Sequence, residues 1–293
     1  MADDFDVAPY RLHSCQVRLL EDLIYINLSD SDETVADFDR IATDLTPFVR
    51  PHGLTRARIA HRQNYPIDAN WKLVTENGLE CYHCQHAHPQ YASVNAYVRA
   101  DNKAPGSYER ARERWVAKAM ALGHMTSNVS SDADTPQQPY GAGRQPIQEG
   151  FVTHTEDGKP AAPLMGDFSE YDGGETFVFV GPLNFFYCAN DHAVTFRITP
   201  LRVDRTDLEV VWLVDEDAKE GVDYDRKRLT WMWDVTTEQD KTIITNNQAG
   251  VSSRRYTPGP YGEREYFADF FARWYLSRIA GTPISFDAFS VFT

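Results

Sequence analysis

The sequence predicts an α+β fold, because helical and strand patterns occupy separate parts of the chain instead of alternating. Residues 71–82 and 108–122 are rich in good helix formers, and a group of apolar strand-like stretches follows them. Residues 222–248 and 262–279 then return to helical spacing. Helices, then antiparallel strands, then helices again is the order typical of a single antiparallel sheet with helices packed on it.

The N-terminal part is expected to form a hairpin, a helix and a strand. Residues 15–28, CQVRLLEDLIYINL, have the pattern of two short strands that turn at the Glu-Asp pair between them. Residues 30–50 are acidic with apolar side chains at helical spacing, and residues 57–67 partly alternate as a strand does. Asn70 is the expected cap of the helix over 71–82.

The middle of the chain is expected to contain a long loop and then the sheet. Residues 123–150 carry Ser, Asp, Gln, Pro and Gly with little apolar content, which predicts a polar loop. The apolar stretches at 175–181, 184–198 and 207–214 have the pattern of strands with one buried face.

Composition argues against several classes of function. A net charge of −14 disfavours nucleic acid and anionic membranes as partners. No apolar run approaches the roughly 20 residues of a membrane span, and the acidic start lacks the layout of a secretory signal. Four cysteines are too few for a disulfide framework in a chain of 293 residues. We therefore expect a reduced, cytoplasmic protein.

The segment 70–89, NWKLVTENGLECYHCQHAHP, carries the strongest chemical signal. It places Glu80, His83 and His88 within nine residues. Two neutral imidazoles and one carboxylate from elsewhere in the chain form the 2-His-1-carboxylate triad, which holds non-heme Fe(II) and leaves positions open for dioxygen. The pattern therefore indicates an oxygenase.

This interpretation requires a break in the helix. His83 and His88 are five positions apart and would project about 140° from one another on a continuous helix, so they could not bind one ion from it. Pro89 stops a helix nearby. The helix is therefore expected to end between Cys84 and Ala87.

The third ligand should be a carboxylate outside this segment. Asp240, within TTEQDKTIITNNQAG, is our candidate, while Asp234 and Glu238 are rivals on the sequence alone.

Zinc is the alternative metal, because Cys81 and Cys84 lie next to the histidines. A structural zinc site normally needs a second Cys/His pair at defined spacing, and Cys15 and Cys188 each stand alone. Cys81 and Cys84 are accordingly expected to be small buried helix residues.

NWKLVTENGLECYHCQHAHP resembles the iron-binding signature of Rieske-type non-heme iron oxygenases, the ring-hydroxylating oxygenase alpha subunit family. Residues 236–253 and 256–275 are similar to further motifs of that family. ECYHCQHAHP and the stretch 156–174 resemble the branch that acts on quaternary ammonium compounds such as glycine betaine, stachydrine, carnitine or choline. The resemblance implies a helix-grip fold, in which a curved antiparallel sheet wraps around a long helix and an apolar tunnel.

The same resemblance implies roles for individual residues. His83, His88 and Asp240 would ligate Fe(II), and Glu80 would be the acid that bridges the electron donor and the iron. Asn77 would lie next to the ligands. A ferredoxin or flavin reductase would supply electrons, and the assembly would be a homotrimer or would include a Rieske-bearing chain.

The resemblance also implies a reaction. We expect oxidation of an N-methyl group, which releases formaldehyde and the demethylated amine. The alternatives are dihydroxylation of an aromatic ring and a non-catalytic hydrophobic ligand-binding remnant. Aromatic faces would hold a quaternary ammonium cation, and the candidates, each of which could instead be ordinary core, are Phe185, Phe186, Tyr187, Trp231 and Trp233.

The family's [2Fe–2S] cluster pattern, Cys-x-His followed by Cys-x2-His, does not occur in these 293 residues. His13 and Cys15 stand in the wrong order. Residues 1–50 are therefore expected to be a linker and strand remnant that follow a missing Rieske domain, and residues 51–293 to form the iron catalytic domain. The cluster would lie on the missing domain or on a partner chain.

Overall fold

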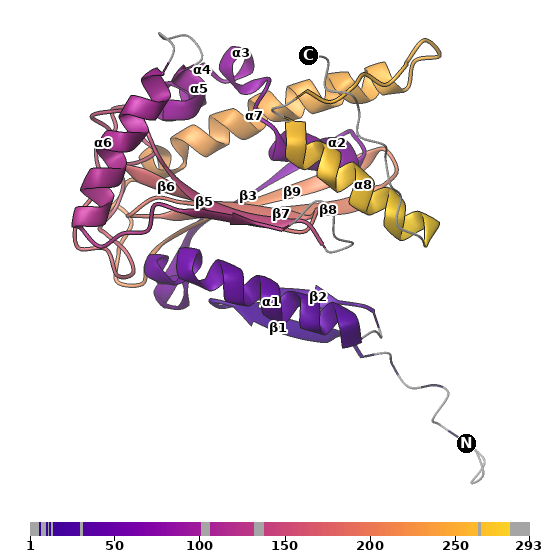
Figure 1. The fold of residues 1–293 in the computed structure, drawn as a ribbon, viewed down its shortest axis with the longest axis horizontal. Coiled ribbons are helices and arrows are strands. Elements are labelled where there is room, and N and C mark those ends of the chain that lie inside the picture. The colour runs from indigo at the N-terminus through magenta and orange to yellow at the C-terminus, as the bar shows by residue number, and fades with distance from the viewer. Residues whose placement is uncertain are drawn as a thin grey trace.

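A seven-stranded antiparallel sheet with the strand order β3-β9-β8-β7-β6-β5-β4 forms the centre of the molecule (Figure 1). The structure is a computed structural model, and it describes residues 14–29, 32–100, 106–131, 138–262 and 265–281, with positions 6, 10 and 12. The strands are β3 Ala57–Ile67, β4 Asn128–Ser130, β5 Tyr140–Pro146, β6 Gly174–Val180, β7 Asn184–Cys188, β8 Ala193–Arg202 and β9 Arg205–Asp215.

One face of the sheet carries most of the helices. Figure 1 shows the long helix α7 running along this face, with α2 and α8 beside it. The larger core cluster, which includes Tyr65, Val210 and Trp212, lies between these helices and the sheet. The bounds are α2 Trp71–Leu79, α3 Cys84–Ala87, α4 Pro89–Val94, α5 Ala96–Ala100, α6 Ser107–Ala121, α7 Arg226–Val251 and α8 Tyr266–Ala280.

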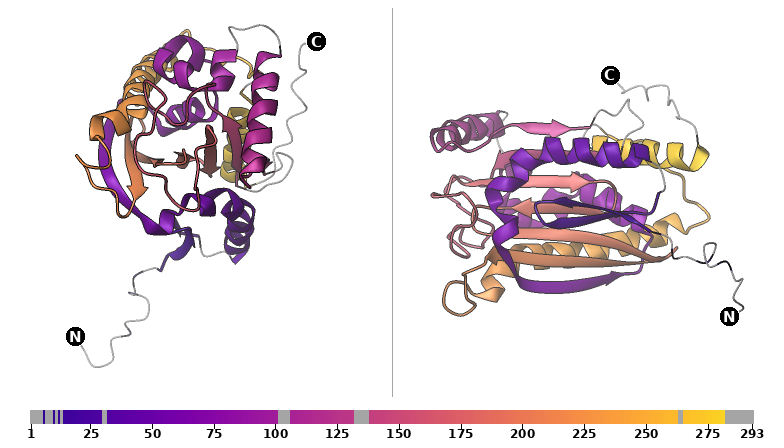
Figure 2. Two further views of the ribbon diagram at one scale, coloured as in Figure 1. Left: turned by 90° about the vertical axis from the view of Figure 1, so that its left-hand side faces the viewer. Right: turned by 90° about the horizontal axis from the view of Figure 1, so that it is seen from below.

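The opposite face is covered by the N-terminal part of the chain (Figure 2). Leu20, Ile41 and Leu45 pack there against Val178 and Phe186 in a second core cluster. The elements are the hairpin of β1 Gln16–Leu20 and β2 Leu23–Asn27, helix α1 Asp32–Val49, and the short 3-10 turns η2 Arg50–His52 and η3 Leu54–Arg56.

The hairpin leaves one of its faces uncovered. The cross-strand pairs Val17–Ile26 and Leu19–Ile24 lie on that face, and their side chains are 47–69% exposed. We call these four side chains the hairpin patch.

Several predictions for the N-terminal half are confirmed. The hairpin turns at Glu21 and Asp22, whose φ angles of 47° and 65° match the tight turn that two-residue hairpins favour. The helix over 30–50 and the strand over 57–67 are present. The Asn70 side chain caps α2 by accepting a hydrogen bond from the Lys72 backbone N–H at 3.1 Å. His13 lies outside the described residues.

The prediction of one polar loop over residues 123–150 is wrong, because β4 and β5 lie within it; residues 132–137 are outside the described part. β5 is buried and pairs with β6. β5 lacks the apolar alternation of a strand because Gly141, Ala142 and Gly143 are small and polar Arg144 and Gln145 follow them. The small residues are required by packing, since a Cβ on Gly141 would come within 2.7 Å of the Phe179 ring. The stretch 184–198 is likewise two strands, β7 and the first part of β8.

The predicted α+β class is confirmed by the order of the elements and by the antiparallel sheet. Within the described residues, no helix is both long and apolar enough to cross a membrane. The boundary expected at residue 50 stays a prediction.

Candidate metal centre and its cavity

The chain breaks its helix twice around the two histidines. Helix α2 ends at Leu79, Glu80 is extended with φ −130° and ψ 163°, and α3 begins only at Cys84. His88 has φ −124° and ψ 73°, and Pro89 then starts α4 at the position where a missing N–H costs nothing. The required break between His83 and His88 is therefore confirmed, but the predicted place is wrong: the first helix already ends at Leu79, and a separate short helix occupies Cys84–Ala87, where the end was expected.

A disulfide joins Cys81 and Cys84 across the first break. The expectation of a reduced protein is therefore wrong, and the prediction that both cysteines are small buried helix residues is confirmed only for Cys84. Cys81 lies outside any helix and is partly exposed, while Cys84 is buried at the start of α3. With its sulfur bonded to another sulfur, Cys84 has no thiolate to offer a metal.

The structure brings His83, His88 and Asp240 together. His83 Nε2 lies 3.3 Å and His88 Nε2 2.9 Å from the same oxygen, Asp240 Oδ1. Two ligands that each lie about 2.1 Å from one metal ion, at right angles, are about 3 Å apart. Both separations from Asp240 Oδ1 are therefore close to the spacing of neighbouring ligands around one metal ion.

The buried atoms of this group also fit a cation. His88 Nε2 and Asp240 Oδ1 have no hydrogen-bond partner among the described residues, although they face one another. Their separation is short, but the alignment of a hydrogen bond is missing. Buried polar atoms are nearly always paired, so an ion bound between them would remove the anomaly.

His83 is held by two neighbours. Its Nδ1 lies 2.5 Å from Glu80 Oε1, and its Nε2 lies 2.9 Å from the Asn77 amide nitrogen, from which it accepts a hydrogen bond when the imidazole is neutral. A carboxylate acceptor on Nδ1 fixes the tautomer that leaves the Nε2 lone pair free. Glu80 therefore reaches His83 from extended backbone.

His88 has a different support, which the sequence did not reveal. Its Nδ1–H donates to Gln239 Oε1 at 2.9 Å, and Gln239 in turn donates to Gln90 at 2.9 Å. Nothing in the sequence distinguishes these glutamines except that Gln239 precedes Asp240.

The two carboxylates set the protonation of the site. Burial by itself would lower the pKa of His83, but its contacts with Asp240 and Glu80 outweigh burial and raise that pKa to about 9. Burial would raise the pKa of Asp240, yet the adjacent His83 and His88 imidazoles hold it below its ordinary value. A metal that binds here must therefore displace a proton from His83.

The rival carboxylates point elsewhere. Asp234 accepts a hydrogen bond from the Tyr65 hydroxyl at 2.6 Å, and Glu238 pairs with Lys241 at 3.4 Å. Neither is placed next to the histidines, so the structure favours Asp240 as the carboxylate of this group.

A cavity of about 360 Å³ opens beside the three candidate ligands. Phe185 and Phe196 stack on its wall with their ring centroids 4.6 Å apart, and Tyr187 and Trp233 lie 4.3 Å apart. Phe185, Tyr187 and Trp233 therefore lie on the wall of this cavity, and their part in holding a cation stays a prediction.

Two other aromatic candidates do not reach this cavity among its described lining residues. Trp231 projects about 200° away from Trp233 around α7 and only packs on the edge of the core. Phe186 alternates with Phe185 and Tyr187 along β7, so it faces the second core cluster. The predictions for these two residues are corrected accordingly.

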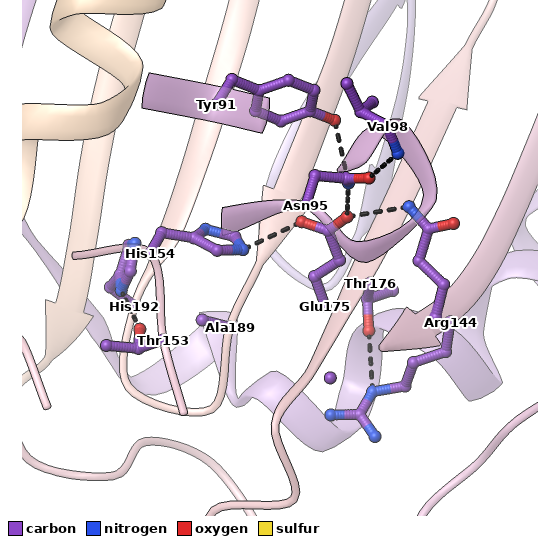
Figure 3. A network of polar contacts seen from close by, with 12 residues as sticks. Tyr91, Asn95, Val98, Arg144, Thr153, His154, Glu175, Thr176, Ala189 and His192 are labelled. Atoms are coloured by element: carbon purple, nitrogen blue, oxygen red, sulfur yellow. Dashed lines mark hydrogen bonds and ion pairs between the residues drawn. The ribbon is translucent and has the colours of Figure 1, made fainter. Parts of the chain in front are cut away.

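A buried carboxylate stands behind the cavity wall (Figure 3). Glu175 Oε1 accepts hydrogen bonds from Asn95 at 2.7 Å and from Gln145 at 2.8 Å, and both donors line the cavity. Glu175 Oε2 lies 2.9 Å from His154 Nε2. Asn95 also donates to the Tyr91 hydroxyl at 3.2 Å. This network had no signal in the sequence.

Comparison with known proteins identifies the family. Residues 54–281 match the family described as ring hydroxylating alpha subunit (catalytic domain). The glycine betaine monooxygenase oxygenase subunit of Chromohalobacter salexigens is 34% identical over 286 residues, covering 95% of this chain and 63% of that protein. The protein of the same description from Pseudomonas aeruginosa is 32% identical over 287 residues, covering 95% and 64%. The chain thus spans less than two thirds of these relatives.

Solved structures share the fold at low sequence identity. A quaternary ammonium Rieske monooxygenase superimposes with a TM-score of 0.60 at 17% identity, covering 94% of this chain and 65% of that chain. A naphthalene 1,2-dioxygenase gives a TM-score of 0.56 at 14% identity, covering 90% and 64%. The predicted helix-grip arrangement is confirmed by these folds, and the chain belongs to the ring hydroxylating alpha subunit family, whose catalytic domain it contains.

Proposed function

We propose that this chain is the catalytic part of a Rieske-type non-heme iron oxygenase in which His83, His88 and Asp240 hold Fe(II). The observation that carries the proposal is the convergence of two imidazole Nε2 atoms on one carboxylate oxygen from helix α7. The unpaired buried atoms of His88 and Asp240 support it. Bound Fe(II) would supply the one-electron chemistry that activates dioxygen at its open positions.

Each neighbouring residue has a part in this proposal. Glu80 keeps the proton of His83 on Nδ1, so that Nε2 can ligate, and it also offers a carboxylate between the iron and an electron donor. The Asn77 amide lies 2.9 Å from His83 Nε2 and must turn away for a metal to bind at that nitrogen. Gln239 gives His88 the same tautomer as Glu80 gives His83.

The electrons would come from a [2Fe–2S] Rieske cluster outside these 293 residues, fed by a ferredoxin or flavin reductase. We keep the division into residues 1–50, a linker and strand remnant, and residues 51–293, the catalytic domain. The hairpin patch supports this division, because four exposed apolar side chains on one hairpin face are typical of a contact surface. A homotrimer or a mixed assembly in the cytoplasm completes the proposal.

The substrate class we propose is a small quaternary ammonium compound. One atom of dioxygen would enter an N-methyl C–H bond, and the N-hydroxymethyl product would break into formaldehyde and the demethylated amine. The aromatic wall of Phe185, Tyr187 and Trp233 supports this proposal, because aromatic faces attract such cations. The names of the two glycine betaine monooxygenase relatives support it as well.

Charged side chains of both signs line the cavity, with Glu80 and Asp240 among the acids and Arg112 and Arg144 among the bases. The preference for a cation over a neutral aromatic ring therefore rests on the aromatic wall and not on the net charge of the lining.

Metal analysis tests the iron site. The parent chain, loaded anaerobically with Fe(II) and desalted, should hold close to one iron, and His83→Ala should hold almost none. His86→Ala is the matched control, because His86 is an exposed histidine in the same segment. Iron binding by His83→Ala equal to that of the parent would refute the ligand assignment and would favour a non-catalytic ligand-binding protein.

Ligand titration tests the substrate class. Trp233→Leu should weaken the binding of glycine betaine or carnitine by roughly tenfold, because the free energy of about one to two cation–π contacts corresponds to that change in affinity. Trp231→Leu, on the far side of α7, should leave it unchanged. Tight binding of naphthalene with no binding of either betaine would point to ring dihydroxylation instead.

A further inference from the structure

The Cys81–Cys84 disulfide encloses His83 in a small covalent loop. The bond spans the break between α2 and α3, with Tyr82 and His83 between its ends. Both cysteines line the cavity beside the proposed iron site. One of the two candidate histidine ligands is therefore tied directly to the redox state of a cysteine pair.

The Cys84 sulfur is close enough to become a ligand itself. The ligand atoms of His83, Cys84 and His88 all lie within 4.8 Å of one another. In a tetrahedral zinc site, with Zn–S near 2.3 Å and Zn–N near 2.1 Å, a sulfur and a nitrogen ligand are about 3.6 Å apart. A sulfur released from the disulfide would need to move by about an ångström to join the two imidazoles.

We propose that this disulfide controls which metal the site accepts. While the bond is intact, the site offers two imidazoles and the Asp240 carboxylate, the set that suits Fe(II) with open positions. When the bond is reduced, the Cys84 thiolate joins His83 and His88 and makes a sulfur-containing site that selects zinc. The inference rests on the proposed iron site and adds to it a second, redox-dependent metal site.

The chemistry of reduction fits the exposure of the two cysteines. Cys81 is partly exposed and follows the exposed break, whereas Cys84 is only 6% exposed and lies on the inner side. A dithiol reductant would attack the Cys81 sulfur and form a mixed disulfide there, which expels Cys84 as a thiolate. The second thiol of the reductant then releases Cys81. Two electrons pass to the cysteine pair, and the reductant leaves as its own disulfide.

The position of the leaving sulfur decides the outcome. Attack from the exposed side puts the new thiolate next to His83 and His88 rather than in solvent. A thiolate, two imidazoles and Asp240 would fill four positions around zinc and leave none open for dioxygen. Reduction would thus convert a site that suits oxygen chemistry into a closed one.

Cobalt(II) is a suitable probe, because it binds zinc sites and shows a sulfur-to-metal charge-transfer band only when a thiolate ligates it. The whole chain is stripped of metal and divided into an oxidised sample and a sample reduced under nitrogen with a phosphine that is then removed. Each is titrated with cobalt(II) and, separately, with zinc against a chelator. We expect the band only in the reduced sample, with zinc binding tighter by roughly tenfold or more.

Two single variants separate the sulfurs. Cys81→Ser leaves Cys84 permanently free, so it should show the band without reduction. Cys84→Ser leaves Cys81 free and should never show it. Absence of the band from both the reduced parent and Cys81→Ser, or its presence in Cys84→Ser, would overturn the inference.

The failure of this inference is distinguishable from failure of the proposed function. An oxidised parent that binds Fe(II) through His83 while reduction changes neither band nor zinc affinity keeps the iron site and rejects the redox control. An oxidised parent that binds no Fe(II), while the reduced chain binds zinc, retains the cysteine site and rejects the oxygenase.

Discussion

Replacing Gln239 by Leu should weaken Fe(II) binding without touching any proposed ligand. Gln239 Oε1 accepts the Nδ1–H of His88 at 2.9 Å, and His88 is 1% exposed, so water cannot take over this role. Leucine has a similar volume but no acceptor. The substitution therefore removes one hydrogen bond from the back of a ligand and leaves the packing nearly intact.

The size of the effect follows from the tautomers of His88. With Gln239 present, the proton stays on Nδ1 and the Nε2 lone pair faces Asp240. Without it, the proton can move to Nε2, where the negative charge of Asp240 stabilises it across the 2.9 Å that separate Nε2 from Oδ1. A metal must then reverse that shift. Outer partners of metal-bound histidines are typically worth 10–100-fold in affinity, or about 1.4–2.7 kcal/mol.

The affinity is measured by anaerobic Fe(II) titration against a competing chelator. Gln90→Leu is the control variant, because Gln90 contacts Gln239 and not His88. It should lose much less Fe(II) affinity than Gln239→Leu does. Gln239→Glu keeps an acceptor oxygen and should retain most of the affinity. If Gln239→Leu binds Fe(II) within twofold of the parent, the tautomer argument is wrong.

Three further predictions concern the stability of the fold at low pH, the backbone conformation of a buried glycine, and the pH dependence of Fe(II) binding. Burial, aided by nearby Arg144, lowers the pKa of His52 to about 3, so the folded chain keeps this imidazole neutral at pH 5. In the unfolded chain the imidazole takes up a proton as pH falls below 6.5, which favours unfolding, so urea unfolding should show about 2 kcal/mol less stability at pH 5 than at pH 7 from this residue, and His52→Gln should lack that part. Gly166→Ala should lower the free energy of unfolding, measured by thermal unfolding, by at least about 2 kcal/mol, because φ at Gly166 is +66° and the new Cβ would lie 2.2 Å from the Pro51 carbonyl oxygen. Gly150→Ala is the control: its new Cβ meets no atom within 4 Å, so it should cost less. Fe(II) affinity should rise about tenfold per pH unit below pH 9, since binding displaces the His83 proton. Calorimetry in two buffers of different ionisation enthalpy measures this proton release, and a binding enthalpy that is the same in both buffers would contradict the prediction.

The local part of the site was readable from the sequence because spacing alone decided it. His83 and His88 are five positions apart, and two residues at that separation on one continuous helix cannot bind the same ion, so a break between them was required. The place of the break was not readable. Helix propensity continues through Glu80 and Tyr82, but the chain leaves the helix after Leu79, where the disulfide and the contact of Glu80 with His83 hold the backbone extended.

The rest of the site depends on long-range packing and left no local trace. Gln239 looks like any polar helix residue until α4 and α7 pack together and bring it to His88. Glu175 sits in an ordinary strand sequence, and only the arrival of Asn95 and Gln145 shows that its burial is supported by hydrogen bonds. β5 has no strand pattern in the sequence because the small residues Gly141, Ala142 and Gly143 do not provide the alternation of apolar side chains by which a strand is predicted.

Helix α7 explains why the metal group and the aromatic wall belong to one site. Trp233 and Asp240 are seven residues apart, which is close to two full helical turns, so they project from the same face about 10.5 Å apart along the axis. Both line the cavity, with Thr236 and Thr237 between them on the same face. One rigid element thus carries both an aromatic face of the cavity and the carboxylate of the metal group. Their relative position therefore depends on the geometry of α7 and not on a flexible loop, which is why we regard this helix, more than any single ligand, as the element that joins the metal group to the aromatic wall.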